Sequence, residues 1–281
     1  MDTPIDNATV YGSIPVTGWA LDDLQVLGVK IYRDPLAGEA THTNGYVYVG
    51  DALFIEGARP DVEAAYPNFP KNNRAGWGFM LLTNQLPNSG NGSFVLRAIA
   101  TDMELQQIQI GSKTIVCDNA NAIYPFGAID TPSQGGTASG NDFINFGWAL
   151  TPQPNAIPTD GSTIRVVVDG VNLGNPSYNN YRSDIAGLFP GYANSNGAVG
   201  YFYLDSTGYA NGLHTIEWSV TDDAGNYSGI GSRYFSVYNS SPDVKNARNS
   251  VNGSRLYHVR QLEQFRQANS LIRYHKGFGQ E

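Results

Sequence analysis

The sequence has few of the residues on which catalysis and metal binding usually depend. It contains one cysteine, Cys117, so an intrachain disulfide and a metal site built on several cysteines are both excluded. It contains four histidines and no G-x-S-x-G, H-E-x-x-H or phosphate-binding loop. No apolar stretch reaches the ~18 residues of a transmembrane helix. We therefore expect a chain that is not an enzyme, uses no cofactor and no metal, and does not insert into a membrane.

Charged residues are also scarce, at 15 % of the chain, and they are unevenly distributed. Residues 1–238 carry ten Lys or Arg against 22 Asp or Glu, a net charge of −12. Residues 239–281 carry seven against three, a net charge of +4. The acidic body argues against nucleic acid as a partner, because phosphate contacts need clustered cations.

The first ten residues, MDTPIDNATV, are acidic and polar and do not resemble a signal peptide. Two interpretations fit this start. The one we favour is an internal piece cut from a longer secreted chain, with Met1 added, which predicts an extracellular or cell-surface location. The other is a cytosolic protein.

Glycine and aromatic residues are abundant: the chain holds 32 Gly, 17 Tyr, 12 Phe and 4 Trp. Such a composition is typical of short strands joined by tight turns rather than of helices. The length of 281 residues suggests about two domains. The composition therefore favours short strands and tight turns, and the length favours about two domains.

The strongest signal in the sequence is an internal repeat. Six short motifs of the first half recur in the same order in the second half, and each copy spans roughly 110–120 residues, the size of one sandwich domain. The pairs are Asp2-Thr3-Pro4 with Asp130-Thr131-Pro132, Gly18-Trp19-Ala20-Leu21 with Gly147-Trp148-Ala149-Leu150, Arg59, Asp61 and Pro67 with Arg182, Asp184 and Pro190, Asn91-Gly92 with Asn211-Gly212, Thr101-Asp102 with Thr221-Asp222, and Ile110-Gly111-Ser112 with Ile230-Gly231-Ser232. We expect the two copies to share one strand order, with their differences confined to loops.

Alternating apolar and polar residues predict strands in the second copy. In His214–Thr221, the side chains of Ile216, Trp218 and Val220 alternate with polar ones, so one face of this strand is buried. Asp169-Gly170 is a dipeptide that tight hairpin turns prefer. The other predicted strands are Asn145–Leu150, Thr163–Asp169, Val171–Gly174, Tyr201–Asp205 and Ser232–Tyr238.

The order of these motifs resembles the tandem immunoglobulin-like repeats of bacterial secreted and surface proteins. The resemblance rests on the segments DTP, GWAL, VDGV, FPG, HTI and TDDAGN, and it covers about residues 2–238. The second copy is the closer match, since Gly92-Ser93-Phe94 in the first replaces Gly-Leu-His and Met103-Glu104-Leu105 interrupts its last turn. The resemblance implies a spacer, an adhesive unit or an accessory module, and it implies no particular activity.

We therefore expect an all-β chain of two tandem immunoglobulin-like β-sandwich domains, residues 1–120 and 126–238. The joint between them, Asp118–Phe126, is short, which predicts a limited range of relative orientations. Residues 239–281 are expected to form a polar linker and a basic tail.

The tail carries a moderate helical pattern. Val259, Leu262, Phe265 and Ile272 fall on one side of a helix, which would be marginal alone in water. Three interpretations stay open: a disordered end, a helix that docks on the acidic domains of its own chain, and a helix that binds a partner.

Two repeated features favour structural roles over ligand binding. Trp19 and Trp148 occupy equivalent positions inside predicted strands, where a Trp is more often a central core residue than a sugar platform. The pairs Arg59/Asp61 and Arg182/Asp184 are expected to be internal pins, with the Arg bridging to backbone carbonyls and the Asp capping the short helical turn that follows.

The long loop Tyr178–Gly197 is the best candidate for a ligand site. Exposed aromatic rings and amide groups are what flat carbohydrate recognition needs. The competing interpretation is that Phe189-Pro190 plugs the end of the sandwich while the Asn residues only make turns. An exposed aromatic platform would favour sugar binding, and buried aromatics would favour a spacer. The candidate ligand-binding residues are Tyr178, Tyr181, Arg182, Asp184, Tyr192 and Asn194.

The turn after the fifth predicted strand of the second copy offers a weaker candidate for calcium. Asp222, Asp223 and Asn226, with Asp205, could supply oxygen ligands. Asp-rich turns are far more often only turns, so we expect no metal here. The function predicted overall is a non-catalytic structural or adhesive module of an extracellular bacterial protein. The alternative is a carbohydrate-binding accessory module, and the partner would be a glycan or another surface protein.

Overall fold

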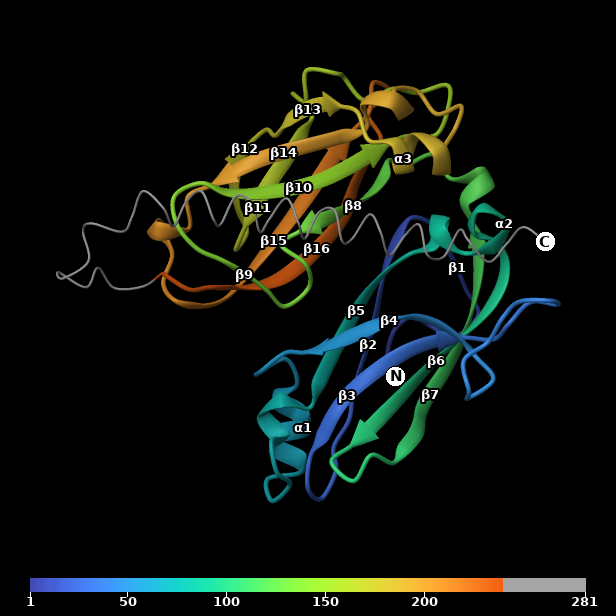
Figure 1. The fold of residues 1–281 in the computed structure, drawn as a ribbon, viewed down its shortest axis with the longest axis vertical. Coiled ribbons are helices and arrows are strands. Elements are labelled where there is room, and N and C mark those ends of the chain that lie inside the picture. The colour runs from blue at the N-terminus through green and yellow to red at the C-terminus, as the bar shows by residue number, and fades with distance from the viewer. Residues whose placement is uncertain (240–281) are drawn as a thin grey trace.

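The computed structural model describes residues 1–239, which form two β-sandwiches joined end to end (Figure 1). The predicted tail therefore lies outside the described residues, apart from Asn239. Helices in the described part are short and sit in the connections between strands. They are α1 (Pro60–Ala65), α2 (Pro87–Gly90) and α3 (Ser183–Leu188), with single 3₁₀ turns η1 (Asn72–Arg74), η2 (Thr83–Gln85), η3 (Asn119–Asn121), η4 (Ser195–Gly197) and η5 (Ser206–Gly208).

The second sandwich consists of a four-stranded and a five-stranded sheet. The first has the order β13-β14-β10-β8, and the second has the order β12-β11-β15-β16-β9. The strands are β8 (Phe126–Thr131), β9 (Gly136–Ala138), β10 (Phe143–Leu150), β11 (Ile164–Val168), β12 (Val171–Gly174), β13 (Ser177–Asn180), β14 (Val199–Leu204), β15 (Gly212–Thr221) and β16 (Tyr227–Val237).

This strand order is immunoglobulin-like. Taken in chain order, the strands put A, B, E and D in one sheet and C′, C, F and G in the other, which is the arrangement of that fold. The first strand is divided: β8 pairs antiparallel with β10, whereas β9 pairs parallel with β16 in the opposite sheet. The chain changes sheets at Pro132, which has no N–H to continue a ladder.

The first sandwich keeps this order but joins its sheets through one strand. Its order is β1-β7-β6-β3-β4-β5-β2, in which β4 pairs with β3 through its first residues and with β5 through Leu53 and Phe54. One continuous strand therefore stands where the second copy has β12 and β13. The expectation that the copies differ only in loops is wrong at this point. The strands are β1 (Ala8–Val10), β2 (Ser13–Trp19), β3 (Val26–Arg33), β4 (Val47–Phe54), β5 (Gly76–Leu82), β6 (Asn91–Asp102) and β7 (Gln107–Asp118).

Each sandwich has its own core with a buried tryptophan. Trp218 on β15 is fully buried together with Ile216 and Val220, as the alternation in this strand predicts. Its indole N–H donates to the side-chain oxygen of Asn145 at 2.7 Å. The corresponding ring in the first core is Trp77, which comes from β5 rather than from the strand equivalent to β15.

The repeated glycine before Trp19 and Trp148 makes room for these core rings. A Cβ at Gly147 would lie 3.0 Å from Trp218, and one at Gly18 would lie 2.5 Å from Trp77. In both copies the glycine points inward, so the Trp that follows it must point outward, because neighbouring strand residues face opposite sides.

The predicted hairpin turn is confirmed. Asp169 and Gly170 both have positive φ, 50° and 78°, as a type I′ turn requires. The Asp169 carboxylate also accepts hydrogen bonds from the backbone N–H and the hydroxyl of Thr215, which ties the turn to β15.

An asparagine closes each copy in the same way. The side-chain oxygen of Asn119 accepts from the Gly12 N–H at 2.9 Å, and its amide donates to the Gly90 carbonyl at 2.6 Å. The side chain of Asn239 likewise accepts from the Gly140 N–H at 3.2 Å and donates to the Ser206 carbonyl. Because Asn119 is buried and directly follows the end of β7, at the start of the joint, it anchors the last strand of the first sandwich at the point where the chain leaves it.

The two sandwiches make direct contact. The Ser13 hydroxyl donates to the Gly127 carbonyl at 3.0 Å, and Leu82 joins a buried cluster of the second sandwich that includes Phe126. Tyr11 and Tyr124 stack beside the joint, with ring centroids 5.6 Å apart. The short joint therefore connects two surfaces that already touch.

Candidate functional site

The aromatic side chains of the loop Tyr178–Gly197 are mostly used for packing. Tyr178 is buried in the core of the second sandwich, and its hydroxyl donates to the Ala149 carbonyl at 2.8 Å. Phe189 is buried against Trp148, and Tyr192 lies half-buried against Phe189. Of the candidate tyrosines, Tyr181 is the exposed one, with 67 % of its surface accessible. These rings do not form a flat exposed platform.

The asparagine candidate of the same loop serves its local turn. Asn194 has positive φ, 59°, directly before η4, and its amide donates to the Gly197 carbonyl at 3.2 Å. Its side chain thus stabilises the loop, and ligand binding by Asn194 stays a prediction.

The expectation that Trp19 and Trp148 are core residues is confirmed for Trp148, which belongs to a buried hydrophobic cluster, and is wrong for Trp19. Both rings lie on the outer face of their strand, because the glycine before each of them faces the core. Trp148 is nonetheless fully buried, since Phe126 and Phe189 cover it. Trp19 is half-buried, with Tyr66 at a centroid distance of 5.7 Å.

Arg182 and Asp184 belong to an ion-pair network with Asp130, the aspartate of the repeated Asp-Thr-Pro motif. The guanidinium donates from Nε to Asp184 Oδ1 at 2.7 Å and from Nη1 to Asp130 Oδ2. Burial raises the pKa of Asp130, although Arg182 opposes the shift. The expectation of an Arg bridged to carbonyls and an Asp cap on the helix is wrong: the Arg pairs with two carboxylates, and α3 has no side-chain cap.

The first copy repeats this network on an exposed surface. Arg59 donates from Nε to Asp61 Oδ1 at 2.8 Å and from Nη1 to Asp2 Oδ2 at 2.5 Å. The Asp2 and Asp61 side chains are 48 % and 61 % exposed, whereas the Asp184 side chain is 14 % exposed. The same residues therefore form a surface cluster in one sandwich and a covered one in the other.

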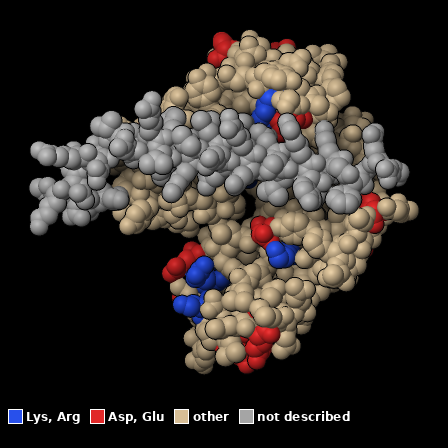
Figure 2. Space-filling model, viewed as in Figure 1, with Lys and Arg blue, Asp and Glu red and all other residues tan. Residues whose placement is uncertain are grey.

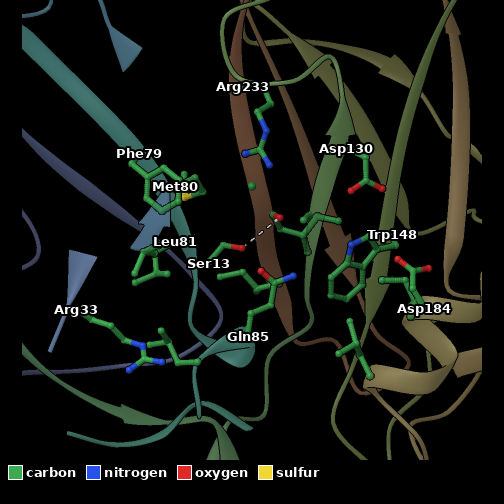
Figure 3. Close-up of a pocket in the computed structure, with 18 of the residues that line it drawn as sticks. Ser13, Arg33, Phe79, Met80, Leu81, Gln85, Asp130, Trp148, Asp184 and Arg233 are labelled. Atoms are coloured by element: carbon green, nitrogen blue, oxygen red, sulfur yellow. Dashed lines mark hydrogen bonds between the residues drawn. The ribbon is translucent and has the colours of Figure 1, made fainter. Parts of the chain in front are cut away.

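The covered network lines a cavity of about 430 Å³ between the two sandwiches. Figure 3 shows Phe79, Met80 and Leu81 of β5 on one side and Asp130, Trp148 and Asp184 of the second sandwich on the other. Residues of both copies thus contribute to one site. The sequence does not predict this cavity, because no pattern in either copy indicates which surface of one sandwich contacts the other.

A second arginine of the cavity, Arg233 on β16, was also missed. It directly follows the repeated Ile-Gly-Ser motif, and Lys113 is its equivalent in the first copy. Arg233 donates to the carbonyls of Ile129 and Ser232, at 2.7 and 3.0 Å. Burial lowers its pKa, and the charge of Asp130 opposes the shift. The recurrence of a cation at this position is the signal that could have identified it.

The charged residues of the network alternate in sign, and the residue at each end has a polar group without a partner among the described residues. The order is Arg233, Asp130, Arg182, Asp184, with Asp130 interacting electrostatically with the other three. Among residues 1–239, no carboxylate lies within 4 Å of the Arg233 guanidinium, and Asp184 Oδ2 is buried without a hydrogen-bond partner. A buried acceptor without a partner is uncommon and calls for an explanation.

The acidic turn proposed for calcium is held together by donors. Asp222 is buried and accepts hydrogen bonds from Thr151, Asn155, Ala224 and Asn226, all at 2.9–3.1 Å. Oxygens engaged in this way serve the turn rather than a cation. Within the described part of the chain, no group of three or more His, Cys, Asp or Glu could hold a metal ion.

His214 forms a partly buried pair with Asp169 of the hairpin turn. Nδ1 lies 2.6 Å from Asp169 Oδ2, and Nε2 lies 2.8 Å from the Ala210 carbonyl. Burial alone would lower the pKa of His214, but the bonds to Asp169 and Ala210 outweigh it and raise the pKa. The pair therefore favours the protonated imidazole.

The His214 pair predicts a pH-dependent contribution to stability. Because the folded-state pKa is raised, the contribution is complete below the unfolded value of about 6.5 and is lost as pH rises through the folded value. Urea unfolding of the natural chain and His214→Gln at pH 5.5, 7 and 8.5 measures it. The difference between the two should be largest at pH 5.5, and a constant difference would contradict the assignment.

On the described surface that is visible in Figure 2, positive groups stand beside negative ones, and some negative groups stand alone. Figure 2 shows Lys and Arg side chains close to Asp and Glu side chains in small groups. Among residues 1–239, no helix has the length and apolar character needed to cross a membrane.

Comparisons with known proteins give only weak structural similarities. No protein-family model matches the sequence, and no curated protein matches it. Among solved structures, the chain is similar to the fibronectin(III)-like modules of Clostridium thermocellum CbhA, at 13 % identity over 85 % of this chain and 93 % of that one, with a TM-score of 0.28. It is also similar to Dpr2 Ig1-Ig2 in complex with DIP-Theta Ig1-Ig3, at 8 % identity over 84 % and 94 % with a TM-score of 0.26, and to the tandem Ig repeats of Dlar, at 7 % identity over 84 % and 94 % with a TM-score of 0.24. These values are too low to carry an argument about ligands or function.

Proposed function

We propose that this chain is a non-catalytic structural module, in which two immunoglobulin-like sandwiches are held at a fixed angle. It would act as a spacer or adhesive unit of an extracellular bacterial protein. The observation that carries the proposal concerns the loop Tyr178–Gly197, which was the strongest site candidate in the sequence. Its rings pack inward except for Tyr181, and its charged pair, Arg182 and Asp184, is held in internal ion pairs.

The contacts between the sandwiches support a fixed angle. Ser13 donates to backbone carbonyls of the second sandwich, and Leu82 is buried beside Trp148. Leu53 also lies against Gly135, where an added Cβ would come within 2.9 Å of the Leu53 side chain. With contacts on several sides of the joint, rotation of one sandwich against the other would break packing that is already formed.

The proposal predicts one narrow distance distribution between the sandwiches. Spin labels at Asp23→Cys and Glu217→Cys, both exposed positions, can be measured by double electron–electron resonance. The natural Cys117 should not be labelled, because it is buried and burial raises the pKa of its thiol to about 11. The labelled chain should give a single narrow peak.

Asn119→Ala should broaden this distribution, because it removes the anchor of the last strand beside the joint. Asn239→Ala is the matched control, since it removes the equivalent side chain at the far end of the second copy and should leave the distribution unchanged. A broad or multiple distribution in the unsubstituted chain would contradict the fixed angle.

A ligand-binding role for the loop can be tested separately through Tyr181, its exposed ring. Titration with polysaccharides should show no saturable binding by the natural chain. Saturable binding that is lost in Tyr181→Ala would instead support the carbohydrate-binding alternative.

A further inference from the structure

The cavity between the sandwiches has the size and lining of a small-molecule site. Its volume, about 430 Å³, lies within the roughly 300–1,000 Å³ range of such pockets, which often lie at domain interfaces. Its apolar lining includes Met80 and Leu82 of the first sandwich and Trp148 and Leu188 of the second. Its polar lining includes the network of two arginines and two aspartates described above, and also Ser13, Gln85 and Arg33, whose guanidinium is paired with Glu39.

Arg233 sets the chemistry of the ligand. Two of its N–H groups donate to backbone carbonyls, which leaves further donors of the planar guanidinium without a partner in the described residues. A half-buried guanidinium with no carboxylate within ion-pair distance is costly, since its water is partly removed and only the charge of Asp130, beyond that distance, offsets the loss. A planar carboxylate matches the guanidinium geometry better than any other common anionic group except phosphate.

The apolar walls exclude a small inorganic anion as the whole ligand. An ion such as phosphate would satisfy Arg233 but would leave Met80, Leu82 and Trp148 facing unfilled space. It would also carry two charges towards Asp130, which lies in the same network. A single carboxylate on an apolar body satisfies the guanidinium, fills the space between the sandwiches and adds one negative charge only.

We propose that the cavity between the two sandwiches binds a small organic acid, whose carboxylate pairs with Arg233 and whose apolar body lies against Met80, Leu82 and Trp148. Because residues of both sandwiches line the cavity, the bound acid bridges them. The site goes beyond the structural role proposed above, and its test does not depend on the angle between the sandwiches.

The probes are 3-phenylpropanoate, indole-3-acetate and hexanoate, each with its neutral amide as the matched control. Saturation-transfer NMR and calorimetry on the full chain should show at least one acid binding with a Kd on the order of mM or tighter. Its amide should bind at least about tenfold more weakly. The absence of saturable binding by all three acids at concentrations on the order of 10 mM, or equal binding of acid and amide, would overturn the proposal.

Three variants locate the site. Arg233→Gln should weaken binding of the acid at least about tenfold, whereas Lys113→Gln, the equivalent position of the first copy, should leave it unchanged. Met80→Trp should abolish binding by filling the cavity from the opposite sandwich. If circular dichroism shows that Arg233→Gln does not fold, Met80→Trp decides alone. Binding unchanged in Met80→Trp, or equally weakened in Lys113→Gln, would place the acid elsewhere and overturn the proposal.

Discussion

Replacing Trp148 by Ala should lower the free energy of unfolding by about 3–5 kcal/mol, the range for a large aromatic side chain that is fully buried. Trp148 is 1 % exposed, and it packs against Phe126 and Phe189 on the outer face of β10. Its loss would leave a void beneath the loop that carries α3. The void would also reach the other sandwich, because Leu82 belongs to the same buried cluster.

Trp19→Ala is the matched control for this prediction. The residue occupies the same position of the repeat, but it is half-buried and contacts Tyr66 rather than two covering aromatic rings. Its loss should cost about 1–2 kcal/mol, in proportion to the smaller apolar area that it buries. Urea unfolding followed by far-UV circular dichroism measures both. If the two variants lost the same free energy of unfolding, the greater burial of Trp148 would not contribute to stability, and the prediction would be wrong.

Replacing Arg182 by Ala should cost about 3–5 kcal/mol at pH 7, because it leaves two partly buried carboxylates without their cation. Arg182 pairs with Asp130 and Asp184, and its own side chain is 11 % exposed. Arg59→Ala removes the equivalent cation of the first copy, whose carboxylates are exposed to water. The loss there should be well below that of Arg182→Ala, as is typical of exposed ion pairs.

The Arg182→Ala loss should shrink at acid pH. Burial already raises the pKa of Asp130, and removal of Arg182 takes away the main opposing influence, so this pKa rises further. A carboxyl whose folded-state pKa is raised destabilises the fold when it is ionised, and this effect disappears as pH falls through the folded value. Unfolding at pH 7 and pH 5 should therefore show a smaller difference from the natural chain at pH 5. A loss independent of pH would mean that Arg182 contributes by packing rather than by charge.

Local patterns in the sequence determined much of the fold. The alternation of Ile216, Trp218 and Val220 predicted an inward face, and Asp169-Gly170 predicted a tight turn. Both depend on residues that are neighbours in the chain, where strand periodicity and backbone conformation act directly. The matched order of the six motifs likewise predicted two sandwiches with one strand order, because repeated sequence imposes repeated local structure.

The repeat also identified residues that act as a pair, but it did not reveal their other contacts in the folded chain. Arg182 and Asp184 were recognised as a structural pair, yet their third member, Asp130, lies 52 residues from Arg182. When both faces of a strand are apolar, its sequence pattern does not say which face points between the two sheets. The sequence therefore predicted burial of Trp148 but not that its ring lies on the outer face of the strand. The inward position of Gly147 decided that question, and it depends on Trp218 of a distant strand.

The contact between the two sandwiches was decided by the tertiary structure alone. It covers the charge network of the second copy and leaves that of the first exposed, although both copies carry the same residues in the same order. Burial depends on which surfaces meet across the joint, and no short-range pattern encodes that choice. The sequence by itself therefore determined two immunoglobulin-like sandwiches and their repeated residues. Only the packing of one sandwich on the other placed the charged residues of the second copy, and not their equivalents in the first, in the lining of a cavity.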